Sequence, residues 1–123
     1  MRWALVLSVV AVAGCAAERQ NVAGREGMLA AAGFTVRPAD TAARQAELRT
    51  LPPHRFVTQA GNGKTVYLYP DPTQCGCLYI GSEPAYQQYQ RMAVQAELAD
   101  EQPAAAPMAM DRWNWAPWGP GWW

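Results

Sequence analysis

The chain has 123 residues, which leaves room for one small domain once terminal segments are set aside and excludes a large multidomain enzyme. Half of the residues are hydrophobic, but 23 of these are Ala, and only 14 residues from Cys15 onward are Leu, Ile, Val or Phe. The core is therefore expected to be small. Ten basic and ten acidic side chains give a net charge of zero, so the charge favours neither nucleic acid nor an anionic lipid surface as a partner.

The N-terminal segment has the layout of a secretory signal. Arg2 adds a positive charge to that of the N-terminus, and residues 4–13 form an uncharged, mainly apolar stretch of ten residues. A helix of that length spans roughly 15 Å, about half of the hydrocarbon thickness of a bilayer. We therefore expect residues 1–14 to be a signal peptide and not a transmembrane helix.

The apolar stretch ends in Val12-Ala13-Gly14-Cys15, which resembles the lipobox of bacterial lipoproteins. The resemblance implies cleavage before Cys15 and attachment of a diacylglyceryl group to its sulfur. Two or three acyl chains hold a protein stably at a membrane, at about 0.8 kcal/mol per buried CH₂ group. Because Ala16 follows the cysteine in place of the Asp that retains many lipoproteins at the inner membrane, the resemblance implies the periplasmic side of the outer membrane. The alternative is an ordinary signal peptide, with Cys15 removed or free.

Composition divides the remaining chain into three zones. Residues 15–21 are polar and are predicted to be a tether, and residues 22–101 contain nearly all the branched and aromatic core candidates. Residues 102–123 contain four Pro, two Gly and five Trp without helical or strand periodicity. This tail is expected to be disordered.

Two helices are predicted at the start of the domain. Residues 22–32 are rich in helix formers, and Gly33 follows at the position where glycine commonly ends a helix. A second helix is predicted to begin near Asp40 or Thr41 and to continue to about Leu51, before Pro52-Pro53. Their core-facing residues are expected to be Val22, Leu29, Met28 and Ala32 in the first helix, and Leu48, Leu51 and either Ala43 or Ala46 in the second.

The pattern then changes to that of strands. Residues 54–59 and 64–69 flank Asn62-Gly63, a strong hairpin signal, and residues 77–80 predict a third strand. Ser82 and the following Glu83-Pro84 predict the start of a third helix that continues to about Ala99. The predicted fold is α+β, a three-stranded antiparallel meander with about three helices.

Strict alternation gives the predicted sheet two different faces. Val66 and Leu68 share an aliphatic face with Leu78 and Ile80. The opposite face carries aromatic and sulfur-bearing side chains, namely Tyr67, Tyr69, Tyr79, Cys75 and Cys77. A two-residue hairpin loop pairs Phe56 with Tyr69, whereas a three-residue loop pairs it with Leu68, and the sequence leaves both open.

Cys75-Gly76-Cys77 is the one group of residues with reactive chemistry. If Cys15 is lipidated, these two cysteines form an even pair outside the cytoplasm. Residues two apart in an extended strand lie near 6.6 Å, at the long edge of the disulfide range, and the central glycine permits a shorter separation. The interpretations are a local disulfide or loop thiols without a catalytic role, a redox-exchange site, or a soft-metal site that adds Met108 and Met110.

Other catalytic signals are absent from the sequence. His54 is the single histidine and is interpreted as a residue at the start of a strand. No metalloprotease, nucleophile-elbow or P-loop pattern occurs. The acidic residues are assigned to a turn, a helix start and a helix end, and not to an acid–base pair: Asp71, Glu83, Asp100 and Glu101. We therefore expect no enzymatic activity, no bound cofactor and no metal.

The tryptophans of the tail are expected to pack against a binding partner, because the exposure of large apolar rings to water is unfavourable. They are Trp113, Trp115, Trp118, Trp122 and Trp123. Lipid headgroups, cell-wall glycan, a groove of an envelope protein and the chain's own aromatic sheet face are all suitable, since tryptophan combines an apolar ring with a polar N–H.

The segments PPHRFVTQ, NGKTVYLY and DPTQCGCLYIGSEPAYQQYQ resemble the folded part of short bacterial lipoproteins over residues 28–92. This resemblance implies no particular activity. The sequence thus predicts a membrane-anchored envelope lipoprotein with a non-catalytic interaction or structural role that uses the tyrosine face and the tryptophan tail. The alternative is a periplasmic redox or soft-metal module that uses Cys75 and Cys77.

Overall fold

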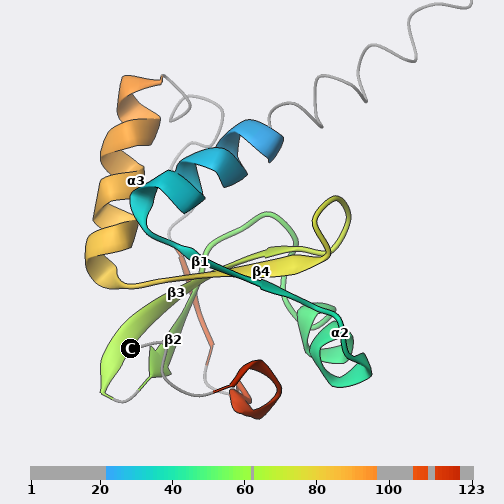
Figure 1. The fold of residues 1–123 in the computed structure, drawn as a ribbon. Coiled ribbons are helices and arrows are strands. Elements are labelled where there is room, and N and C mark those ends of the chain that lie inside the picture. The colour runs from blue at the N-terminus through green and yellow to red at the C-terminus, as the bar shows by residue number, and fades with distance from the viewer. Residues whose placement is uncertain (1–21, 62, 97–106, 111–112, 120–123) are drawn as a thin grey trace, which may run out of the picture.

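The computed structural model describes residues 22–61, 63–96, 107–110 and 113–119. Its centre is a five-stranded mixed sheet with the strand order β1-β4-β3-β2-β5 (Figure 1). The strands are β1 (Thr35–Pro38), β2 (Val57–Gly61), β3 (Lys64–Asp71), β4 (Cys77–Gly81) and β5 (Met108–Ala109). The helical elements are a first helix over residues 22–32, α2 (Ala42–Leu48), α3 (Glu83–Gln95) and the short 3₁₀ helix η2 (Ala116–Trp118).

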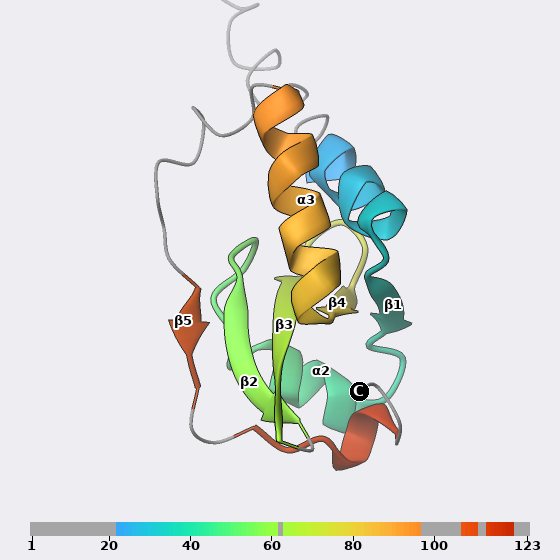
Figure 2. The same ribbon diagram turned by 90° about the vertical axis from the view of Figure 1, so that its left-hand side faces the viewer.

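The elements form three layers. The first helix and α3 cover one face of the sheet, and α2 and η2 lie against the other (Figures 1 and 2). The α+β class is confirmed, but the prediction of a three-stranded meander is incomplete. The meander β2–β3–β4 forms the middle of the sheet, β1 pairs antiparallel with β4, and β5 pairs parallel with β2.

The two added strands lack the local signal by which strands are recognised. β1 is mostly exposed and ends in Pro38, and β5 has two exposed residues. β5 is held by backbone bonds from the N–H groups of Met108 and Met110 to the carbonyl oxygens of Phe56 and Thr58, at 3.2 and 3.0 Å. Such pairing is decided by partners far away in the chain, so alternation within the segment does not reveal it.

The predicted helix caps are confirmed. Gly33 ends the first helix with φ of +108°, a conformation that glycine adopts without steric cost. Thr41 and Ser82 are the N-caps of α2 and α3, and their hydroxyl oxygens accept from the N–H groups of Arg44 and Ala85. α2 ends at Leu48, earlier than predicted, and α3 ends at Gln95.

Two strand boundaries and one side-chain prediction need correction. β2 begins at Val57 and not at His54, because His54 adopts φ of +57° and leaves the extended region. β3 continues past the predicted end at residue 69 as far as Asp71. Leu48 and Leu51 are buried as predicted, but Ala43 and Ala46, expected to face the core, are exposed.

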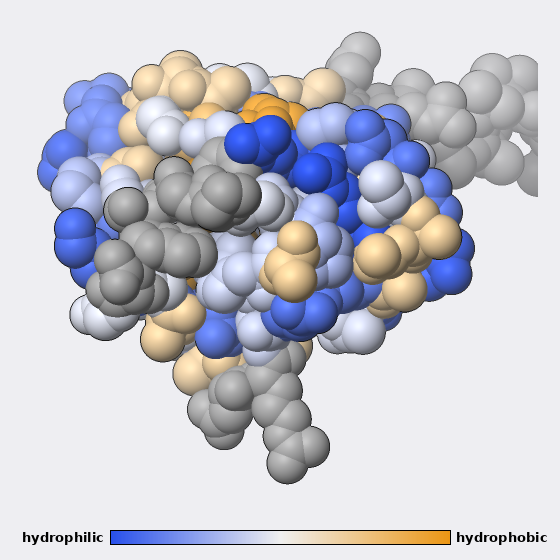
Figure 3. Space-filling view, turned by 60° about the horizontal axis from the view of Figure 1, so that its bottom comes forward, coloured by the Kyte–Doolittle hydropathy of each residue, from blue (hydrophilic) through white to orange (hydrophobic). Residues whose placement is uncertain are grey.

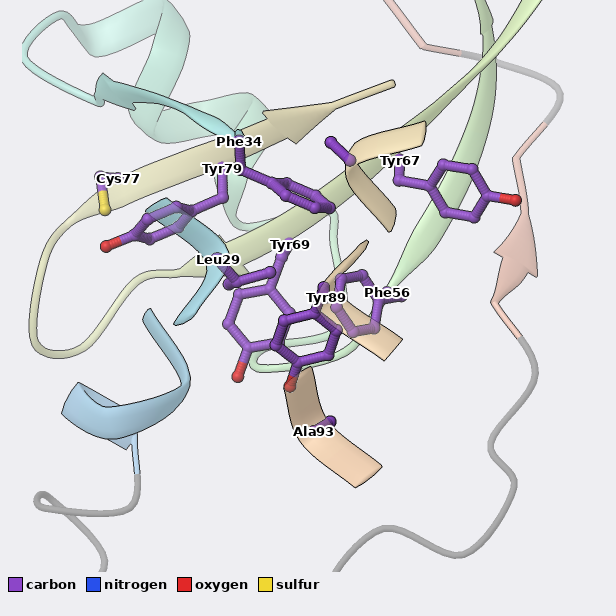
Figure 4. Close-up of a cluster of buried hydrophobic side chains, with 10 residues drawn as sticks. Leu29, Phe34, Phe56, Tyr67, Tyr69, Cys77, Tyr79, Tyr89 and Ala93 are labelled. Atoms are coloured by element: carbon purple, nitrogen blue, oxygen red, sulfur yellow. The ribbon is translucent and has the colours of Figure 1, made fainter. Parts of the chain in front are cut away.

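The two-faced sheet is confirmed, and both faces are buried. The aliphatic cluster, under α2 and η2, contains Val66, Leu68, Leu78 and Ile80. The aromatic cluster, under the first helix and α3, contains Tyr67, Tyr69, Tyr79 and Cys77. Gly61 pairs with Lys64, so the hairpin loop has two residues. Phe56 accordingly joins the tyrosine face, with its ring centroid 5.1 Å from that of Tyr69. Figure 4 shows this aromatic cluster.

The predicted tail contributes to the fold. Residues 108–109 and 116–118, expected to be disordered, form β5 and η2, and the Trp118 side chain is fully buried. Its ring stacks on that of Trp113 with a centroid separation of 6.0 Å, and its indole N–H donates to Glu47 Oε2 at 3.1 Å. Arg44 Nε donates to the carbonyl oxygen of Pro117 at 2.6 Å. The sheet face that α2 alone leaves open is closed by this C-terminal segment.

Candidate functional site

The turn between β3 and β4 places the two cysteines in different environments. Asp71 ends β3 and pairs directly with Cys77, the first residue of β4, so residues 72–76 form the loop. Gly76 has φ of +63°, which a glycine adopts readily. Cys75 lies exposed in this loop, and Cys77 is 1% exposed. Their sulfurs are joined in a disulfide, with the Cα atoms 5.1 Å apart.

Cys75 therefore does not lie on the tyrosine face of the sheet, where alternation placed it. The strand pattern stops at Asp71, and the loop carries Cys75 outward. Cys77 does lie on that face, within the aromatic cluster.

The carboxylate of Asp71 organises the loop. It is fully buried and accepts three backbone N–H bonds, from Thr73 and Gln74 to Oδ1 at 3.0 and 2.9 Å and from Cys75 to Oδ2 at 3.0 Å. The Thr73 hydroxyl donates to Oδ1 at 3.2 Å. An aspartate that binds the N–H groups after it is typical of a tight turn. This confirms the turn role assigned to Asp71, and the same carboxylate also contacts His54 and Glu26.

His54 lies against the same carboxylate. Its Nε2 is 3.1 Å from Asp71 Oδ1 and 3.4 Å from the Thr73 hydroxyl oxygen. Because an ionised carboxylate only accepts hydrogen bonds, Nε2 donates to it. The backbone N–H of His54 donates to the carbonyl oxygen of Pro70 at 2.9 Å, which fixes the left-handed conformation of the residue. The single histidine is therefore a partner of the turn and not a strand residue.

A second carboxyl group meets Asp71 from the first helix. Burial, together with the hydrogen bond to Asp71 and its negative charge, raises the pKa of Glu26 to about 8, against a smaller opposing effect of the bond to Tyr79. Burial by itself would raise the pKa of Asp71, but the hydrogen bonds from Glu26 and from the N–H groups of Gln74, Cys75 and Thr73 outweigh it and hold that pKa far below its ordinary value. The pair therefore holds one proton at neutral pH, mainly on Glu26.

Tyrosines surround this carboxyl pair. Burial and then the charges of Glu26 and Asp71 raise the pKa of Tyr79 to about 12. Burial also raises the pKa of Tyr69 to about 12, against the opposing effect of Arg25. Both hydroxyl groups therefore stay protonated at neutral pH, and Asp71 is the ionised member of the cluster.

Sequence reasoning missed this cluster, although a signal was present. Glu26 lies four residues after Val22 and three before Leu29, on the buried stripe of the first helix. An acidic residue at such a position requires a partner inside the protein. The partner, Asp71, comes from a strand much later in the chain, and the spacing within the helix does not identify it.

The tyrosine face is not a surface for a partner, contrary to the expectation. Tyr67, Tyr69 and Tyr79 are 8%, 0% and 6% exposed because the first helix and α3 cover them. The Tyr67 ring stacks on that of Tyr86, with centroids 4.0 Å apart, and its hydroxyl donates to Glu83 Oε2 at 2.6 Å. These rings pack the core.

The predicted tryptophan site divides into parts with different roles. Trp118 is a core residue, and Trp113 and Trp115 are half-buried against the aliphatic cluster. The tail thus binds the chain's own aliphatic sheet face and not its aromatic face. Trp122 and Trp123 lie outside the described residues, as do the predicted signal peptide, the tether and Cys15.

The residues of the predicted soft-metal site do not lie together in the structure. Met108 lies on β5, at the sheet edge opposite β1, and Met110 packs with the aliphatic cluster, whereas Cys75 and Cys77 lie at the β3–β4 turn and are joined to each other. Among the described residues, no three His, Cys, Asp or Glu side chains are grouped to hold a metal ion.

The described helices are all too short or too polar to cross a bilayer. No family model, no curated protein and no solved structure matches this chain. Its function must therefore be inferred from the arrangement of its own residues.

Proposed function

We propose that the chain is an envelope lipoprotein, anchored to the periplasmic side of the outer membrane through Cys15, with a non-catalytic interaction or structural role. The observation that carries the proposal is the apolar stretch of ten residues that ends in Val12-Ala13-Gly14-Cys15. A stretch of this length serves for export but is too short to remain as a membrane span. Acyl chains on one sulfur provide the anchor instead.

The folded domain is consistent with an anchor at the chain terminus. Both sheet faces are covered by the chain's own helices and C-terminal segment. Figure 3 shows that the coloured part of this side of the molecule presents mainly hydrophilic residues, interspersed with weakly hydrophobic ones and with one more hydrophobic area at its edge. Because the chain covers these faces itself, we propose the lipid on Cys15, and not a sheet face, as the membrane contact.

Mass spectrometry of the N-terminus, combined with membrane fractionation, tests the anchor. We expect a mature chain that begins at a triacylated or diacylated Cys15 and that sediments with the outer membrane. The matched variant Cys15→Ser is expected to be unacylated and absent from that fraction. An unacylated wild-type chain, free in the soluble fraction after export, would contradict the proposal.

Trp122 and Trp123 remain the tail residues proposed to contact an envelope protein or cell-wall glycan. A truncation at residue 102 is unsuitable as a test, because it removes the buried Trp118 and with it part of the core. The double variant Trp122→Ala/Trp123→Ala keeps Trp118 and every other residue that the structure describes. We expect it to lose partners that the wild-type chain retains in crosslinking within intact cells, and identical partners would show that these two residues bind none of them.

A second candidate function is thiol–disulfide exchange at Cys75 and Cys77. The observation that favours it is the disulfide itself, which joins an exposed cysteine to a buried one that lies opposite Asp71 in the β3–β4 register. Incubation of the full chain with a reduced, unfolded protein tests this function. Transfer of the disulfide that is lost in Cys75→Ser and in Cys77→Ser would support it, and a rate equal to that of a short peptide disulfide would contradict it.

A further inference from the structure

Cys77 and Asp71 share one face of the sheet, and Glu26 meets Asp71 there from the first helix. Asp71 and Cys77 are directly opposite in the β3–β4 register, and side chains opposite each other in antiparallel strands have Cβ atoms about 4.5–5.5 Å apart. Tyr79 is two residues further along β4 and shares the face, and it bonds to Glu26. Figure 4 shows the Cys77 side chain and the Tyr79 ring on the same side of β4, with the tyrosine hydroxyl directed toward the Cys77 end of the strand.

The two cysteines differ in exposure, and this difference decides which sulfur is attacked and which one leaves when the disulfide opens. Cys75 is exposed, so an external thiolate reaches its sulfur, and the electron pair of the broken bond then stays on the sulfur of Cys77. Cys77 is 1% exposed, and a thiolate in so buried a position is costly unless it receives a proton. The nearest carboxylate, Asp71, is ionised and adds repulsion. A proton donor is therefore needed on this face.

Glu26 has the properties of that donor. At neutral pH it holds the single proton of the carboxyl pair, and a carboxylic acid with a pKa of about 8 matches a thiol closely enough for transfer in either direction. Its Oε1 is buried and makes no hydrogen bond within the described part of the chain. Its bonds to Asp71 and Tyr79 place the carboxyl group beside the residue opposite Cys77 in the β3–β4 register and the residue two positions after Cys77 on the same face.

We infer that Glu26, held by Asp71, donates the proton that the sulfur of Cys77 receives when an external thiol opens the Cys75–Cys77 disulfide. The inference rests on the second candidate function for its biological use. In the first step a thiolate bonds to the sulfur of Cys75, the disulfide bond breaks, and Cys77 leaves as a thiolate that takes the proton from Glu26. A second thiol of the reductant then displaces Cys75, so the reductant becomes a disulfide and the chain a dithiol. Glu26 recovers a proton from solvent.

Other titratable and charged groups face the pair from each neighbouring element. They are Tyr79 on β4, Tyr69 on β3, Arg25 on the first helix and His54 before β2. Both tyrosines have pKa values of about 12 and hold their protons throughout the pH range of the test. His54 donates to Asp71 on the side of the turn. Glu26 is therefore the acid on this face whose titration falls within the range of the test.

The test is the pH profile of disulfide reduction by dithiothreitol in the full chain. Tryptic peptide 65–91 contains both cysteines, so alkylation and mass spectrometry report their state separately from Cys15. Rates are divided by those of a short unstructured peptide disulfide at the same pH, which removes the titration of the reductant. We expect the wild-type ratio to fall about tenfold as the pH rises through about 8, and the ratio of Glu26→Gln to be low and independent of pH.

Glu47→Gln is the matched control, because Glu47 is also a partly buried glutamate, but it bonds to Trp118 on the opposite face. This variant is expected to keep the wild-type profile. A wild-type ratio without pH dependence, or a Glu26→Gln variant that keeps the wild-type profile, would overturn the inference. Dithiothreitol reduces any accessible disulfide, so a normal profile without transfer to a reduced protein would refute the exchange function and leave the proton donor standing.

Discussion

Replacement of Trp118 by Ala is the sharpest test of whether the C-terminal segment belongs to the fold. The side chain is fully buried in the cluster of β-sheet residues under α2 and η2. A tryptophan buries about 200 Å², which at about 25 cal/mol per Å² corresponds to about 5 kcal/mol as an upper estimate. Truncation of a buried tryptophan to alanine costs about 3–5 kcal/mol in practice, because the site collapses only in part.

Two further contacts are lost in Trp118→Ala. The carboxylate of Glu47 loses the indole N–H at 3.1 Å, and the guanidinium of Arg44 loses the ring that lies 5.5 Å from its central carbon. We therefore expect the free energy of unfolding to fall by at least about 3 kcal/mol. For a domain of this size that corresponds to a decrease in Tm of about 12 °C or more.

Urea unfolding of the full chain, followed by far-ultraviolet circular dichroism, measures the loss. Val94→Ala is the control, because Val94 is 64% exposed on α3, and it is expected to change stability by less than about 0.5 kcal/mol. A loss below about 1 kcal/mol in Trp118→Ala would show that the tail does not close the aliphatic face, and the three-layer description would then be wrong.

Three further predictions concern single positions. In Gly81→Ala the new Cβ would lie 2.5 Å from the ring of Phe34, so we expect a loss of about 1–3 kcal/mol in urea unfolding, and no loss would contradict the packing. Ser82→Ala removes the N-cap of α3 and is expected to cost about 1 kcal/mol in the same assay, with unchanged stability as the opposing result. The pKa of Glu26 is raised in the folded chain from 4.5 to about 8. Its contribution to the free energy of unfolding is therefore complete below about pH 4.5 and is lost as the pH rises through about 8. Stability should therefore decrease between about pH 5 and about pH 8, and a variant Glu26→Gln that keeps the wild-type slope would refute this assignment.

The candidate site is partly visible in the sequence. The CGC motif indicates a local disulfide or loop thiols, and Asp71 is recognisable as a turn residue. The pairing of Glu26 with Asp71 is not visible in the sequence, because the helix pattern places Glu26 on the buried side but does not identify its partner. The strand assignment of His54 is wrong for a similar reason, since its left-handed conformation depends on the carbonyl oxygen of Pro70 and the carboxylate of Asp71.

Local chemistry determined the parts of the molecule whose partners are near in the chain. Hydroxyl caps at Thr41 and Ser82, a glycine at position 33 and the Asn62-Gly63 loop are short-range signals, and alternation along 64–69 and 77–80 specified two sheet faces.

Tertiary structure decided which elements cover those faces. The apolar pattern of a strand requires burial but does not state what buries it, so the same pattern is satisfied by a partner, a membrane or the chain itself. Here the first helix and α3 bury the tyrosines, and Trp118, which is far from the sheet strands in the sequence, packs on the aliphatic face. The parallel addition of β5 and the meeting of Glu26 with Asp71 arise from the same long-range packing, which no local pattern encodes.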